Sequence, residues 1–225
     1  MKTLLQSLVL VCGLAASPAF AVSLGTSDPA NDFLPSYTGA HNGDLDALFA
    51  YGIYDAGAQE FTFGATVGAA IGTTPTGAFV WGVDRGAGTQ RFVTGSPSIG
   101  AGITFDAVVL VNANGTGLVN LFSGPAVSLA ASAITIQNNT ISVVVPLAML
   151  PTTGAAATAY KWNFWPRNQA ITGNAGISDF APNASSIGTL SVSPVPEPQI
   201  ALTMAAGLGL IGAVAVRRRR EALNA

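Results

Sequence analysis

Acidic side chains near the start of the chain have the chemistry of a calcium site. Asn42, Asp44 and Asp46 recur at every second position, so an extended segment would carry their side-chain oxygens on one face. Asp28 and Asp32 precede them, and the intervening loop can bring these two carboxylates alongside. Calcium binds such hard oxygen ligands, although the sequence has no EF-hand loop with its distal glutamate. These five residues are the candidate calcium ligands, and the alternative that we favour is solvated turn residues without an ion.

Trp165 and three charged residues are the candidates for carbohydrate binding. Aromatic faces cover the apolar C–H faces of a sugar ring, while amides and carboxylates bond its hydroxyls. Trp165 falls on the strand face opposite to its aromatic neighbours and stands before Arg167, so we predict an exposed platform there. Asp84 and Arg85 follow another strand and would either contact a ligand or form a turn-capping ion pair.

The other large aromatic residues are predicted to lie in the core. Tyr160, Trp162 and Phe164 alternate along one strand and therefore share a face. Trp81 alternates in the same way with apolar neighbours on its own strand. We expect all four side chains to pack inside the domain.

Catalytic chemistry has little support in the residue types. His41 is the only histidine, and the serine-rich stretch 95–100 is not a nucleophile elbow. Paired aspartates would serve a glycosidase, but no local spacing sets two of them at the required separation. His41 and Met149 are the only conventional haem ligands of the mature domain. We expect no enzyme, with a glycosidase as the least favoured alternative, and no cofactor other than calcium.

A β-rich domain between residues 22 and 194 must position these side chains. Apolar residues alternate with period two between clusters of Gly, Pro, Asn and Thr, which is typical of short antiparallel strands. Residues 55–57 and 138–139 are predicted hairpin turns, and 147–150 a single helical turn. We predict an all-β fold, a single antiparallel β-sandwich of jelly-roll-like form. The predicted strands are 45–54, 60–66, 78–84, 90–94, 103–111, 118–122, 133–137, 140–145, 158–165 and 186–192.

The charge balance and the cysteine count exclude two classes of chemistry. Residues 22–194 hold four basic against nine acidic side chains, a formal charge of −5. Because nucleic-acid phosphates require a basic face, we expect no nucleic-acid partner. Cys12 is the only cysteine and lies in the first apolar segment, so the mature domain has no thiol chemistry and no disulfide.

The first twenty-one residues have the pattern of a signal peptide. Lys2 precedes an apolar run, and Ala19 and Ala21 are the small residues that a signal peptidase reads. We predict cleavage after Ala21, with a retained anchor as the alternative. The rest of the chain would then be exported.

The C-terminal segment has the pattern of a membrane anchor. Residues 200–216 contain no charge and would form a helix of roughly 25 Å, enough for a thin bilayer. Residues 217–220 are all arginine, the basic flank that stays on the cytoplasmic side. The segment is either an ordinary anchor that is never processed or part of a sorting signal.

The order of these parts resembles a PEP-CTERM sorting signal of Gram-negative bacteria. Val195, Pro196, Glu197 and Pro198 come first, then the apolar helix, then Arg217, Arg218, Arg219 and Arg220. The resemblance covers residues 195–225. It implies recognition by a membrane-embedded exosortase and an association with exopolysaccharide and biofilm.

The domain itself resembles the DOMON-like and family-9 carbohydrate-binding sandwiches. Residues 28–33, 37–39 and 43–46 are similar to the opening of such modules, and residues 179–183 to a stretch near their end. This resemblance implies a jelly-roll-like sandwich and permits sugar binding.

Together these features predict an exported, exosortase-sorted, non-catalytic protein of the cell surface or extracellular matrix. Its precursor is expected to be anchored in the inner membrane by the C-terminal helix. Signal peptidase and exosortase are the expected partners during export, and exopolysaccharide afterwards. A carbohydrate-binding module is the alternative function.

Overall fold

Alternating side chains produce strands that bury one face. The computed structural model describes residues 25–192. In β3 (Glu60–Val67), for example, every second side chain is buried, namely Phe61, Phe63, Ala65 and Val67. Such a strand places every second residue on the same side of its sheet. The described residues are all-β, without an α-helix, as the sequence predicts.

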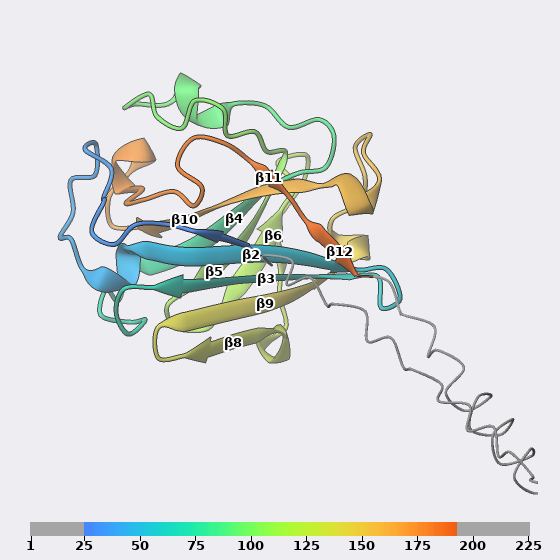
Figure 1. Ribbon diagram of the computed structural model, residues 1–225, viewed down its shortest axis with the longest axis horizontal. Helices are drawn as coiled ribbons and strands as arrows, with labels where there is room; N and C mark the ends of the chain where they lie inside the picture. The colour runs from blue at the N-terminus through green and yellow to red at the C-terminus, as the bar shows by residue number, and fades with distance from the viewer. Residues whose placement is uncertain (1–24, 193–225) are drawn as a thin grey trace, which may run out of the picture.

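Two six-stranded sheets make up this part of the chain (Figure 1). The first has the order β1-β2-β3-β9-β8, and β12 pairs with β2. Its other strands are β1 (Gly25–Ser27), β2 (Ala47–Asp55), β8 (Ile134–Gln137), β9 (Thr140–Pro146) and β12 (Leu190–Val192). Its pairings are antiparallel except that of β12 with β2.

The second sheet has the order β11-β10-β4-β5-β6-β7 and is antiparallel throughout. Its strands are β4 (Gly77–Asp84), β5 (Ala107–Asn112), β6 (Gly117–Asn120), β7 (Val127–Ser128), β10 (Lys161–Asn168) and β11 (Ile187–Gly188). Short 3-10 turns connect the strands: η1 (Gly43–Leu45), η2 (Arg91–Thr94), η3 (Ala131–Ala133), η4 (Leu147–Met149), η5 (Ala157–Ala159) and η6 (Gly173–Gly176). Between residues 25 and 192, none of these turns has the length and hydropathy of a membrane span.

The main core lies between the two sheets, as in a β-sandwich. Phe63 of the first sheet faces Trp81 of the second, with ring centroids 6.2 Å apart, and Trp81 contacts Phe164 at 5.0 Å. Tyr160, Trp162, Phe164 and Trp81 are all buried, which confirms their predicted place in the core.

A second apolar cluster covers the outer face of the second sheet. The long connection between β4 and β5 contributes Phe92, Ile103 and Phe105, and the loop after β10 contributes Ile177 and Phe180. In Figure 1 the connection from β4 to β5 arches above the sheets, in green. These segments extend the fold beyond two layers.

Most of the predicted strands are present with shifted ends, and the two hairpin turns are confirmed. Asp55 Oδ1 accepts hydrogen bonds from the Gly57 and Ala58 backbones, and Asn138 adopts φ +54° between β8 and β9. The predicted strand 90–94 is wrong, because its apolar Phe92 packs on the second cluster from a 3-10 turn. Residues 103–106 of the predicted strand 103–111 are irregular apart from a bridge between Phe105 and Thr89, and β1 and β7 lay outside the prediction.

The predicted signal peptide (1–21), the predicted transmembrane helix (200–216) and the arginine cluster (217–220) lie outside the described residues.

Candidate metal centre

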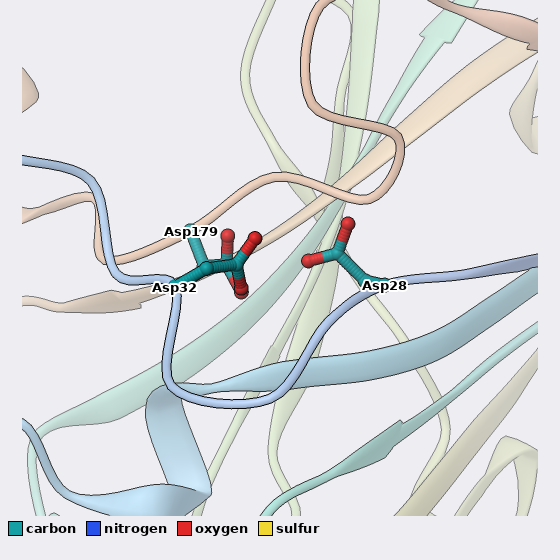
Figure 2. A group of neighbouring side chains, drawn as sticks. All are labelled: Asp28, Asp32 and Asp179. Carbon is teal, nitrogen blue, oxygen red and sulfur yellow. The ribbon is translucent and has the colours of Figure 1, made fainter.

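Three carboxylates converge where the N-terminal segment meets a C-terminal loop. Asp28 and Asp32 follow β1, and Asp179 lies in the loop between η6 and β11. One carboxylate oxygen from each lies within 4.8 Å of the other two. Figure 2 shows Asp32 and Asp179 side by side, with the carboxylate of Asp28 facing them. The arrangement offers three hard oxygen ligands to one cation.

Asp179 is held in place by backbone donors. Its Oδ2 accepts the Ala47 N–H at 2.9 Å, and its Oδ1 accepts the Phe180 N–H at 2.7 Å. The first bond fastens the loop to the start of β2, and Asp179 is fully buried there. The carboxylate is therefore positioned by the fold itself.

Asp28 and Asp32 are less well satisfied. Asp28 Oδ1 accepts a long hydrogen bond of 3.4 Å from the Asn183 side-chain amide. Asp28 Oδ2 and Asp32 Oδ1 are both buried, and neither has a hydrogen-bond partner among the described residues. Because buried polar atoms are almost always paired, these two oxygens indicate a missing partner.

Burial, together with the repulsion between neighbouring carboxylates, raises the pKa of three aspartates here. Burial, and next the charge of Asp32, raises the pKa of Asp28 to about 7. Burial, and next the charge of Asp28, raises the pKa of Asp179 to about 8. Burial also raises the pKa of Asp46, to which Asp32 contributes. Each shift disfavours the charged carboxylate, so the group gains from a bound proton or cation.

The remaining predicted calcium ligands do not join this cluster. Asp44 accepts the Thr74 N–H at 2.6 Å and the Thr74 hydroxyl at 2.8 Å, and Asn42 also donates to that hydroxyl. Asp46 accepts the Asn31 N–H with both oxygens, at 2.9 and 3.0 Å. The prediction of one shared ligand face over residues 42–46 is wrong, because residues 43–45 form the turn η1 instead of an extended strand.

Asp179 was not among the predicted ligands. In the sequence it stands out only as part of the stretch 179–183 that resembles the end of the carbohydrate-binding sandwiches. It is 147 residues from Asp32 along the chain, so no local spacing relates the two. Only the tertiary fold brings them together.

The predicted exposed platform at Trp165 is wrong. Trp165 does point to the face opposite Trp162 and Phe164, but it is only 3% exposed. Phe92 meets its ring edge-on at 4.8 Å, and Phe105 lies 5.2 Å away. The second apolar cluster covers the side chain, so no sugar ring can stack on it in this structure.

The charged candidates for sugar binding have structural partners. Asp84 Oδ1 caps its turn by accepting the Gly86 and Gly88 N–H groups, each at 2.9 Å. Arg85 is buried and pairs with Asp106 at 3.0 Å, not with Asp84. Half-buried Arg167 donates to the Gly173 carbonyl at 3.4 Å, and burial lowers its pKa.

The described domain ends at β12, close to the first hairpin. Val192 lies opposite Asp55 of β2, and its carbonyl accepts the Ala56 N–H at 3.0 Å. Residues 194–220 match the PEP-CTERM protein-sorting motif. The PEP-CTERM motif therefore begins two residues after the last described strand. It marks the chain as an exported protein that an exosortase sorts from a membrane-anchored precursor. No curated protein matches the chain.

Proposed function

We propose that the chain is a non-catalytic protein of the cell surface or extracellular matrix, associated with exopolysaccharide and biofilm. The observation that carries the proposal is the PEP-CTERM motif at residues 194–220, directly after the folded domain. A sorting signal in this position would direct the preceding sandwich domain to the exosortase. The jelly-roll-like form of that sandwich is part of the same proposal.

The residues of the domain support a non-catalytic role. His41, the only histidine, stacks on Phe33 with ring centroids 4.4 Å apart. A glycosidase needs two carboxylates facing an open cleft that admits the sugar. Asp28 Oδ2 and Asp32 Oδ1 are instead inaccessible to solvent, which does not suit a pair of carboxylates that must face an open cleft.

The proposed route follows the order of the segments. Signal peptidase cuts after Ala21, and residues 200–216 hold the precursor in the inner membrane with the four arginines on the cytoplasmic side. Exosortase then acts at the Val195–Pro198 stretch, whose two prolines disfavour a helix. The sandwich is released to the surface or matrix.

Processing tests the proposal directly. The full-length precursor, expressed in a host with an exosortase, should be cut near residues 195–198, and a host lacking the exosortase should retain the uncut form. Intact mass of the exported protein is the measurement. Exported material that still carries residues 217–220 contradicts exosortase sorting. Unchanged biofilm cohesion after deletion of the gene contradicts the matrix role.

Carbohydrate binding is the second candidate, and Phe122 favours it. Its side chain is 41% exposed, and its φ of +60° is unusual for a bulky residue. Asn120 Oδ1 accepts the Phe122 N–H at 2.8 Å, and the Arg91 guanidinium lies 4.0 Å from the ring centroid. A strained, exposed aromatic ring beside a cation is a suitable platform for a sugar ring.

Affinity electrophoresis in gels containing exopolysaccharide tests this second function. Phe122→Ala should weaken retardation of the protein by about tenfold, as expected for loss of a stacking contact. Val127→Ala removes another exposed apolar side chain and is the matched control. Equal retardation of the wild type and Phe122→Ala would exclude Phe122 as the platform.

A further inference from the structure

We propose that Asp28, Asp32 and Asp179 bind a divalent cation of the calcium type. The ion would join the segment after β1 to the loop before β11, two regions that are remote in sequence. This site differs from the predicted one, because it excludes Asn42, Asp44 and Asp46 and includes Asp179. It does not depend on the proposed function.

The unpartnered oxygens are the observation that points to a ligand. Asp28 Oδ2 and Asp32 Oδ1 are inaccessible to solvent and accept no hydrogen bond among the described residues. An oxygen of an ionised carboxylate has no proton to donate, so its partner must be a donor or a cation. The ion pair found between residues 25 and 192 is Arg85–Asp106, so no basic side chain there neutralises the cluster. A bound cation supplies the missing partner.

The dimensions fit an ion of calcium's size. Calcium–oxygen bonds are about 2.3–2.6 Å, so two ligands on opposite sides of the ion are about 4.6–5.2 Å apart. The three carboxylate oxygens lie within 4.8 Å of one another, which places each within reach of one central ion. The ligand set is carboxylate only, whereas zinc is held mainly by cysteine and histidine. Water molecules would complete the coordination shell.

A shared proton is the competing explanation. Asp28 is within hydrogen-bonding reach of Asp179 when one of the two is protonated. Such a proton would relieve the repulsion without any metal. The two explanations differ in their response to calcium, since only the cation site gains stability from the ion.

Melting of the full chain in detergent separates them. The three tryptophans, residues 81, 162 and 165, are buried in the sandwich and report its unfolding by fluorescence. At a calcium concentration of about a hundred times Kd, the wild-type melting temperature should rise by roughly 5–10 °C over that in chelator. Equilibrium dialysis with metal analysis should find one calcium per chain.

Asp32→Asn gives a test with opposite signs in the two conditions. In chelator the variant should melt at or above the wild type, because it removes repulsion from the cluster. In calcium it should melt below the wild type, because it loses a charged ligand. A side chain that only supports the fold would lower the melting temperature in both conditions.

Two matched variants control for charge and location. Asp55→Asn removes one carboxylate from the first hairpin and should keep the full calcium response. Asp44→Asn tests a ligand that the sequence predicted and should also keep the full calcium response. Its melting temperature should fall in both conditions, because Asp44 accepts two hydrogen bonds from Thr74. A wild type that retains no calcium and melts alike in calcium and chelator overturns the proposal in favour of the shared proton. If the calcium-dependent rise in melting temperature is lost in Asp44→Asn but kept in Asp32→Asn, the ion does not bind at Asp28, Asp32 and Asp179.

Discussion

At the scale of single residues, the buried ion pair is the clearest structural use of charge. Arg85 Nε binds Asp106 Oδ1 at 3.0 Å, and Arg85 Nη1 donates to the Pro151 carbonyl at 2.6 Å. Thr153 also donates to Asp106, so the pair links the end of β4 to the segment after η4. All three nitrogens of the Arg85 guanidinium therefore donate to groups within the domain.

We predict that Arg85→Ala lowers the free energy of unfolding by about 3–5 kcal/mol, because it leaves the Asp106 carboxylate buried without a cation. Denaturant unfolding followed by tryptophan fluorescence is the measurement. Arg91→Ala removes an exposed arginine and should cost less than about 1 kcal/mol. Equal effects of the two substitutions would show that the buried pair has no special role.

At the scale of elements, two long connections decide which strand faces are exposed. The side chains of β10 alternate between the main core and the outer face of the second sheet, and the outer face would be solvent-exposed in a plain two-layer sandwich. Here the connection from β4 to β5 and the loop after β10 cover the outer face with Phe92, Ile103, Phe105 and Phe180. Trp165 is the largest side chain beneath them.

We predict that Trp165→Ala destabilises the domain by about 3–5 kcal/mol, because it leaves a large cavity in the second cluster. Denaturant unfolding measures the loss, and Phe122→Ala, at an exposed position, should cost much less. Exopolysaccharide retardation at a temperature where the Trp165 variant is folded should stay unchanged. A stable Trp165 variant that loses retardation would restore the platform prediction.

At the scale of the whole molecule, the two ends of the domain meet on one strand. β1 pairs with Phe49–Tyr51 of β2, and β12 pairs with Ile53–Asp55 of the same strand. The carboxylate cluster adds a second connection between N-terminal and C-terminal segments (Figure 2). Every core residue that the structure describes precedes the PEP-CTERM motif, so cleavage at the motif should leave the melting temperature of the sandwich unchanged within about 2 °C. A comparison of processed and unprocessed protein by thermal melting checks this part of the processing prediction.

Local patterns in the sequence determined the strands, the hairpins and the sorting signal. Period two identifies β3 and β9, Asn138 permits the positive φ of its hairpin, and the order of residues 195–220 identifies the motif. These features depend on neighbours a few residues apart, which sequence spacing reports directly. Jelly-roll-like connectivity stays a prediction.

Only the tertiary structure decided which side chains meet across the chain. It buried Trp165 under segments that begin up to 80 residues earlier, and it paired Asp44 with Thr74 and Asp46 with the Asn31 backbone, outside the group that contains Asp28 and Asp32. It also joined Asp179 to the last two. Burial and ligand geometry depend on packing between distant segments, and strand periodicity shows which face a residue occupies but not what covers that face.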